Sequence, residues 1–213
     1  MFVYHGLLVP PFKIIGRQSW VASQKFGIQD NGLLTFDFEL PWVVKPVAEG
    51  SSIGVSIVKE KTSVRAALDQ VFTLSDKAVV EKYIEGKEVQ VGILNDTVLG
   101  AVEVRPKLEF YTYEAKYTAG LTEYILPPEI EPPTLEKAGA AALLAHRVLG
   151  CKGATRVDLI IDRDGKSFVL EVNTLPGMTE TSLLPKIARL SGLDFPSLIE
   201  AILEESIMEG RRG

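Results

Sequence analysis

The sequence has little cysteine, no long apolar run and no strong excess of charge. Cys151 is the only cysteine among 213 residues, which excludes an internal disulfide framework and a cysteine metal site. No run of eighteen or more apolar residues occurs, so we expect no membrane-spanning helix. Residues 1–16 are apolar but lack a basic start and a small-residue cleavage site, so we expect no secretory signal. These absences favour a cytoplasmic protein.

The charge balance excludes an obvious nucleic-acid surface. The formal net charge is -5 and the pI is about 5.2, whereas nucleic-acid binding usually requires a basic stripe. With 46% hydrophobic and 24% charged residues, the composition is that of an ordinary globular protein. We therefore expect small-molecule partners, with no nucleic acid and no membrane.

Two common nucleotide-binding motifs are also absent. No G-x-G-x-x-G occurs, and Lys45 precedes the Gly-Ser loop at 50–52, which is the wrong order for a Walker P-loop. A Gly-Ser loop can still surround a phosphate with backbone N–H groups. From these residues alone, an ordinary turn is an equal alternative.

Apolar periodicity predicts strands and helices without a regular βαβ repeat. The strands at 79–84 and 89–94 flank Glu85-Gly86, so we interpret them as a hairpin. The other predicted strands are 42–46, 53–58, 97–104, 154–161 and 166–172, and the predicted helices are 63–72, 134–149, 181–191 and 196–208. This order predicts an α+β fold, or mixed α/β, with largely antiparallel sheets. We expect an atypical segment at 1–40, a small lobe at 41–86 and a larger lobe at 87–213.

The most informative segment is a second predicted hairpin, with its turn at Asp164-Gly165. Direct opposition then places Asp158 against Glu171 and Arg156 against Asn173, all on one face of the sheet. The opposite face is expected to be core, made by Val157, Leu159, Ile161, Phe168, Leu170 and Val172.

The polar face of this hairpin points to a metal site. Two directly opposed carboxylates repel each other unless something compensates their charge. Carboxylate and amide oxygens are ligands that Mg²⁺ accepts, and Arg156 beside them can stabilise a developing oxyanion. The alternative is a solvated sheet face on which Arg156 pairs with Asp158 and Glu171.

Three further segments have a functional interpretation and an ordinary one. Residues 79–88 could offer backbone groups to an adenine, or form only a charged turn. The aromatic stretch 110–117 could cover a pocket, or pack as a surface loop. Residues 173–182 lead into a helix whose N-terminus could bind a carboxylate, or carry a plain cap. We interpret His146 and Cys151 as packing or surface residues.

Together these segments resemble the ATP-grasp superfamily and, within it, the D-alanine–D-alanine ligases. The resemblance covers roughly residues 41–208 and rests on WVVKPVAEGSSIGV, AVVEKYIEGKEVQVGIL, FYTYEAKYTAGLTEY, GATRVDLII and LEVNTLPGMTETSLLP. It implies an ATP-grasp fold in which two lobes enclose ATP. It also implies an ATP-dependent carboxylate–amine ligase that forms the D-alanyl dipeptide of peptidoglycan precursors through an acyl phosphate.

The resemblance also assigns roles to individual residues. ATP would be contacted by Lys45, Ser51, Ser52, Glu81, Lys82, Tyr83, Ile84, Glu88, Phe110 and Lys116. Two Mg²⁺ ions, with Mn²⁺ as an alternative, would be bound by Asp158, Glu171 and Asn173. Catalytic roles would fall to Arg156, Tyr117, Ser51 and Gly177, and D-alanine would be contacted by Tyr117, Arg156, Ser182 and Leu183. A homodimer is compatible with the family.

The first 40 residues depart from the family pattern. The family's N-terminal domain has no counterpart before residue 41, and a family lysine that contacts ATP would fall near Gly16, where Lys13 or Arg17 could replace it. We therefore expect a truncated ligase. The alternatives are a catalytically incomplete nucleotide-binding fragment, or a ligase that joins D-alanine to D-lactate or D-serine.

Overall fold

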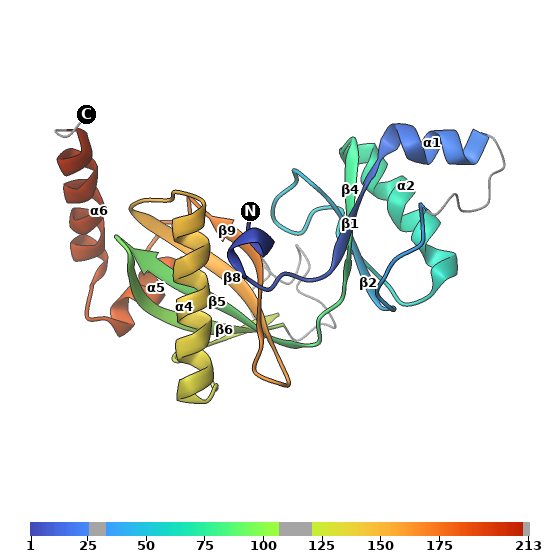
Figure 1. Cartoon of the computed structure of the whole chain (residues 1–213). Coiled ribbons are helices and arrows are strands. Elements are labelled where there is room, and N and C mark those ends of the chain that lie inside the picture. The colour runs from blue at the N-terminus through green and yellow to red at the C-terminus, as the bar shows by residue number, and fades with distance from the viewer. Residues whose placement is uncertain (26–32, 107–120, 211–213) are drawn as a thin grey trace. The chain divides into compact units, whose positions relative to one another are not determined.

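The computed structural model describes residues 1–25, 33–106 and 121–210, and it divides the chain into two compact units. The small unit comprises residues 10–84 and 106–122. The large unit comprises residues 1–9, 85–105 and 123–213. Residues 1–40 are therefore shared between the units. Many of the helices and strands of each unit are labelled in Figure 1.

The small unit is a four-stranded antiparallel sheet with the order β1-β4-β2-β3. These strands are β1 (Phe12–Gly16), β2 (Trp42–Pro46), β3 (Ser56–Val58) and β4 (Lys77–Lys82). The helices are α1 (Arg17–Lys25) and α2 (Val64–Leu74), with a short 3-10 turn η2 (Lys61–Ser63) before α2. In Figure 1, α2 lies beside β2 and β4.

Alternation along the strands divides the small sheet into two faces. One face packs on α2 and forms a core that includes Ile15, Trp42, Val44, Leu68, Val71, Ala78 and Val80. The other face carries Lys45 and Glu81, and it leaves Phe12 and Ile14 half exposed, at 50% and 53%. Lys45 and Glu81, which belong to the motifs that resemble the ligase family, therefore lie on the sheet face opposite α2.

The large unit is a five-stranded sheet with the order β7-β6-β5-β8-β9. Its strands are β5 (Gly86–Leu94), β6 (Thr97–Pro106), β7 (Thr122–Ile125), β8 (Ala154–Asp162) and β9 (Ser167–Asn173). The 3-10 turn η1 (Val3–His5) precedes Leu8, whose carbonyl accepts a hydrogen bond from the Val169 N–H at 2.9 Å. The helices are α4 (Pro132–Val148), α5 (Leu183–Leu190) and α6 (Phe195–Gly210).

Helices cover the two faces of the large sheet unequally. Helix α4 packs on the face that carries Val89, Val91, Val157 and Leu159 (Figure 1). Its residues Ala138, Ala142 and Ala145 are fully buried in this core. Helices α5 and α6 pack on the opposite face, where they contribute Leu184, Ile187, Ala188 and Leu198 to a second core with Leu94, Leu99 and Val102. This second core leaves part of that face for polar side chains.

A pair of glycines allows α5 to approach the sheet. Gly92 of β5 lies directly opposite Gly100 of β6. A Cβ at Gly92 would lie 2.9 Å from Leu184 Cδ1 and 3.0 Å from Ile187 Cγ2, and one at Gly100 would lie 3.2 Å from Leu190 Cδ1. Because any side chain at Gly92 would collide with α5, the glycine sets the distance between the helix and the sheet.

Most of the predicted elements are present, but the hairpin at 79–94 is wrong. Strands β4 and β5 belong to different sheets, and each pairs with other strands. The reason is burial: β4 packs on α2, whereas β5 is the central strand of the large sheet and is buried from Val89 to Leu94. The strand predicted at 53–58 is shorter, because Ile53–Val55 belong to a turn with Ile53 N–H bonded to Gly50 O.

Candidate functional site

The predicted opposition of polar residues on β8 and β9 is confirmed. Asp158 lies opposite Glu171, and Arg156 lies opposite Asn173. The turn itself has three residues rather than two, since Asp162 N–H donates to Lys166 O at 3.0 Å and Gly165 adopts φ +77°. A bulge next to Asp158 and Leu159 then shifts the register back. The extra turn residue and the bulge therefore cancel, and the pairs Asp158–Glu171 and Arg156–Asn173 are as predicted.

The same bulge makes part of the predicted core face wrong. Leu159 pairs with Val169 and Ile160 with Phe168, so Val169 occupies the buried face in place of Phe168 and Leu170. Val169 is 1% exposed and joins the α4 core, whereas Phe168 and Leu170 are only partly buried. One extra residue in a strand reverses the direction of the side chains on one side of it.

Arg156, Asp158 and Asn173 form a hydrogen-bonded group. Arg156 donates to both Asp158 oxygens, from Nε to Oδ1 at 2.8 Å and from Nη2 to Oδ2 at 3.0 Å. Asn173 Nδ2 donates to Asp158 Oδ2 at 3.2 Å and to Glu171 Oε1 at 3.4 Å. This arrangement leaves the Asn173 amide oxygen and the exposed Glu171 carboxylate available to a ligand.

Burial dominates the electrostatics of Asp158. Its side chain is 5% exposed, and desolvation raises the pKa of its carboxyl to about 6. The Arg156 guanidinium opposes this shift, while the nearby Glu171 carboxylate adds to it. A cation placed between the two carboxylates would reverse both unfavourable effects.

The donor set on this face fits a hard divalent cation. Two carboxylates and one amide oxygen supply only oxygen ligands, as Mg²⁺ prefers. In the described parts of the chain, no three histidine, cysteine, aspartate or glutamate side chains cluster as a metal group. Any cation here would therefore keep several ligands from water or from substrate phosphates, as Mg²⁺ usually does.

The turn after β9 is ordered by Ser182, the residue that precedes α5. Its hydroxyl accepts a hydrogen bond from the Thr179 N–H at 3.1 Å and contacts Thr179 Oγ1 at 2.8 Å, and it does not cap α5. A Cβ at Gly177 would lie 2.9 Å from this hydroxyl, so the glycine permits the close approach. Leu183 packs into the α5 core beside it.

In the small unit, Lys45 and Glu81 form an ion pair. They lie on adjacent strands on one sheet face, with Lys45 Nζ 2.7 Å from Glu81 Oε1 and side-chain exposures of 29% and 11%. The N–H groups of Lys82 and Tyr83 donate to Pro11 O and Pro41 O. These two N–H groups therefore hold the strand end in place, and an adenine would have to use other backbone atoms.

The Gly-Ser loop has an unusual backbone. Ser51 and Ser52 adopt φ +55° and +60°, a region that costs non-glycine residues roughly 1–2 kcal/mol each. Strained residues of this kind cluster at ligand-binding loops.

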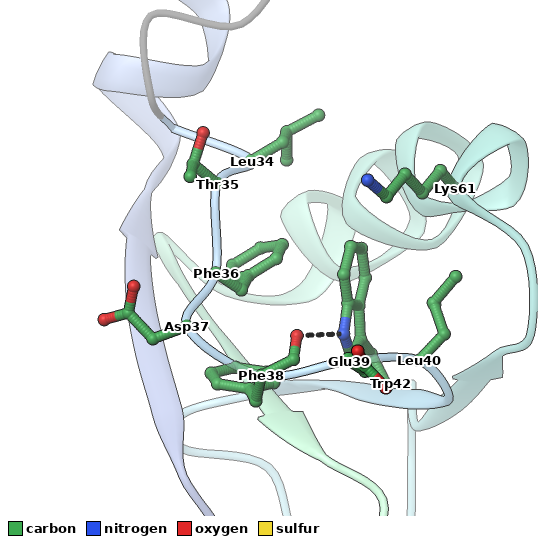
Figure 2. Close-up of a pocket in the computed structure, with 9 residues that line it drawn as sticks. All are labelled: Leu34, Thr35, Phe36, Asp37, Phe38, Glu39, Leu40, Trp42 and Lys61. Atoms are coloured by element: carbon green, nitrogen blue, oxygen red, sulfur yellow. Dashed lines mark hydrogen bonds between the residues drawn. The ribbon is translucent and has the colours of Figure 1, made fainter.

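The small unit contains a cavity of about 540 Å³ that none of the predicted site residues lines. It lies between the segment at 34–40, Trp42 and Lys61 (Figure 2). Phe36 and Trp42 meet edge to face at 4.4 Å, and Trp42 Nε1 donates to Phe38 O at 3.2 Å. Because Trp42 points to the α2 side, the cavity lies on the face opposite Lys45 and Glu81.

Some predicted residues have no described position or serve another role. Phe110, Lys116 and Tyr117 lie outside the described residues. Lys13 Nζ donates to Thr35 O at 3.1 Å, and Arg17 pairs with Asp76 at 2.9 Å, so both are engaged within the small unit.

Gln90 is a buried polar residue on the polar face of the large sheet that the sequence reading missed. It is 2% exposed and lies directly opposite Asp158. The signal was present in the sequence, because Gln90 is two residues from Glu88 on a strand and therefore shares its face.

Comparison with known proteins identifies relatives over nearly the whole chain. A profile of the family described as D-ala D-ala ligase C-terminus matches residues 1–204. The D-alanine–D-alanine ligase of Trichlorobacter lovleyi is 52% identical over 202 residues, covering 94% of this chain and 61% of the relative. That of Geotalea uraniireducens is 46% identical over 203 residues, covering 95% and 62%.

Solved structures of ligases also match this chain. A D-alanine–D-alanine ligase from Bacillus anthracis complexed with ATP matches with a TM-score of 0.78 at 30% identity, covering 100% of this chain and 65% of that one. A D-Ala:D-Ser ligase from Enterococcus faecalis matches with a TM-score of 0.81 at 29% identity, covering 95% and 58%. The fold is therefore the ATP-grasp fold that the resemblance implied.

Two further facts follow from these matches. The chain spans about 60% of the length of the curated relatives named above. The family match begins at residue 1, so it includes residues 1–40, the segment that the sequence motifs predict to be atypical.

The described residues include no helix that is long and apolar enough to cross a membrane.

Proposed function

This chain belongs to the family of D-alanine–D-alanine ligase C-terminal domains, and on that premise we propose that it is the nucleotide- and cation-binding part of an ATP-dependent ligase. The observation that carries the proposal is the group of Arg156, Asp158, Glu171 and Asn173 on one sheet face. The reaction proposed is the joining of two D-alanine molecules in the cytoplasm, for peptidoglycan precursors.

In this proposal, the nucleotide is bound by the residues that the family resemblance assigns to ATP. Lys45 would exchange its bond with Glu81 for a phosphate oxygen, which requires only a rotation of its flexible side chain. The strained Ser51-Ser52 loop would present backbone N–H groups to the phosphates. Residues 81–84 would contact the adenine and Glu88 the ribose, while Phe110 and Lys116 would complete the site.

Asp158, Glu171 and Asn173 would hold the divalent cations, Mg²⁺ or Mn²⁺. A bound cation supplies positive charge that stabilises the phosphoryl group during transfer. Arg156, fixed by two hydrogen bonds to Asp158, would place its guanidinium charge near the reacting carboxylate. Gly177, Ser182, Leu183 and Tyr117 would position D-alanine.

The proposed chemistry has two steps. The carboxylate of the first D-alanine attacks the γ-phosphorus of ATP, which forms an acyl phosphate and releases ADP. The amine of the second D-alanine then attacks the acyl carbon, which forms the peptide bond and releases inorganic phosphate. Because the protein forms no covalent bond, its contribution is positioning and charge.

The test measures phosphate release and dipeptide formation with ATP, Mg²⁺ and D-alanine. D-Alanyl-D-alanine formed with stoichiometric phosphate would support the complete proposal. Saturable binding of an ATP analogue with Mg²⁺, but no product, would reduce the chain to the nucleotide-binding part of a larger enzyme. Absence of nucleotide binding would overturn the proposal.

The alternative function is a ligase that joins D-alanine to a different acceptor substrate, because one structural relative is a D-Ala:D-Ser ligase. Product analysis with D-alanine, D-serine and D-lactate in competition distinguishes these functions. Sedimentation of the same preparation would test the homodimer.

A further inference from the structure

Gln90 occupies a continuous row of opposed residues across the large sheet. The row runs from Val102 on β6 through Gln90 on β5 and Asp158 on β8 to Glu171 on β9. Opposed residues on neighbouring strands point to the same face, so the Gln90 amide shares a face with both carboxylates. A glutamine that is only 2% exposed is unusual on a sheet unless its polar atoms are paired.

Among the residues that the structure describes, only one end of this amide has a partner. Gln90 Nε2 donates to Glu88 Oε1 at 3.5 Å, which is a long hydrogen bond. Gln90 Oε1 is buried and has no hydrogen-bond partner among the described residues. An unpaired buried amide oxygen is destabilising, so its presence requires an explanation.

None of the described side chains around this oxygen donates a hydrogen bond to it. Val102 offers no polar side-chain atom, and Glu88 and Asp158 are carboxylates that accept hydrogen bonds when ionised. Arg156, which lies opposite Gly92, donates to Asp158. Rotating the amide by 180° does not help, because its oxygen would then face Glu88. A donor that arrives with a ligand and tolerates neighbouring carboxylates would satisfy this oxygen.

We propose that Gln90 is a positioning residue of the cation site, whose amide oxygen accepts a hydrogen bond from a water molecule bound to the divalent cation held by Asp158 and Glu171. This inference rests on the proposed function. Mg²⁺ retains several bound waters in proteins, and those waters are strong donors. An acceptor behind them orients the hydration shell without contacting the cation itself.

Three variants test this role. Gln90→Leu keeps the approximate size of the side chain but removes the acceptor. Gln90→Glu keeps an acceptor and adds charge. Gln70→Leu makes the same chemical change at an exposed position of α2 and serves as the matched control. Free Mn²⁺ is measured by electron paramagnetic resonance, with and without a non-hydrolysable ATP analogue, and melting temperature is measured without metal.

The two measurements are expected to move in opposite directions for Gln90→Leu. Mn²⁺ affinity should fall roughly tenfold, as is typical for loss of an outer-shell partner. The melting temperature should rise by roughly 3 °C, because the unpaired oxygen is gone. Gln90→Glu should bind Mn²⁺ at least as tightly as the parent chain and melt lower, since a third carboxylate joins Glu88 and Asp158.

Other results would overturn the inference. Unchanged Mn²⁺ affinity in Gln90→Leu would exclude the role, as would an equal loss of affinity in Gln90→Glu. A fall in both affinity and melting temperature for Gln90→Leu would show a structural glutamine. If the parent chain does not bind Mn²⁺, the cation site of the proposed function fails as well. If the parent binds and Glu171→Gln weakens it, only the Gln90 role is at stake.

Discussion

Protons and divalent cations are expected to compete for Asp158. Desolvation raises the pKa of this carboxyl to about 6, so it carries a proton over part of the range in which an ordinary aspartate is ionised. A cation binds the carboxylate form, and binding must therefore release that proton at low pH. Cation affinity should rise as the pH passes through about 6 and become constant once the carboxyl is fully ionised.

The magnitude follows from the fraction of Asp158 that is ionised. With a pKa of about 6, roughly one molecule in eleven is ionised at pH 5 and nearly all are ionised at pH 8. Cation affinity should therefore be about tenfold weaker at pH 5 than at pH 8, or about 1.4 kcal/mol in binding free energy.

The contribution of Asp158 to the free energy of unfolding should fall as the pH rises, whereas cation affinity should rise. The folded-state pKa lies above the ordinary value of 3.8, so between these values the folded protein holds a proton that the unfolded chain lacks. The contribution of Asp158 to stability is complete below pH 3.8 and is lost as the pH rises through about 6.

The assay is a Mn²⁺ titration without nucleotide at pH 5 to 8, with circular dichroism to confirm that the chain stays folded. The Asp158 carboxyl carbon shift, followed by NMR, gives its pKa directly. Asp158→Asn should lose both the affinity and the pH dependence, while Asp164→Asn, at an exposed turn position, should keep both. Equal Mn²⁺ affinity at pH 5 and pH 8 in the folded parent chain would refute the reasoning.

Three other substitutions are expected to have separable effects. Glu171→Gln should weaken Mg²⁺-dependent nucleotide binding roughly tenfold or more, because one anionic ligand is lost while the shape is kept; an unchanged Mg²⁺ dependence would contradict its role. Lys45→Met should lower nucleotide affinity and cost about 1–2 kcal/mol of unfolding free energy in urea, because Glu81 loses its partner. Adding Glu81→Gln should recover stability but not affinity, and recovery of both would exclude a phosphate contact by Lys45. Gly92→Ala should cost about 1–3 kcal/mol, since its Cβ would lie 2.9 Å from α5, whereas Gly16→Ala, with open space around it, should be nearly neutral in the same melting experiment.

Local sequence patterns determined much of the fold. Apolar periodicity, alanine-rich composition and the stop at Gly150 located the helices at 64–74, 132–148, 183–190 and 195–210 to within a few residues. The Asp-Gly turn and the period of two predicted Asp158 opposite Glu171. This pairing is present because the extra turn residue and the bulge cancel. The resemblance of the motifs to the ligase family extended this reading to function.

Local patterns failed where distant segments decide the structure. Residues 79–94 have two apolar segments around Glu85-Gly86, which predicted a hairpin. Strands β4 and β5 nevertheless enter different sheets, because each is buried by a partner far away in sequence. The register within the β8–β9 hairpin was partly wrong for a subtler reason. A three-residue turn and a bulge are both compatible with the same sequence, and packing of Val169 on the α4 side selected them.

The sequence by itself determined which residue types are available for chemistry and which elements carry them. Only the tertiary structure decided that Gln90 lies against Asp158, that Lys45 pairs with Glu81, and that Gly92 makes room for α5. The physical reason is that these relations depend on strand neighbours and burial, which bring together residues far apart in the chain. The raised pKa of Asp158 arises in the same way, because desolvation exists only once the sheet and its helices have formed.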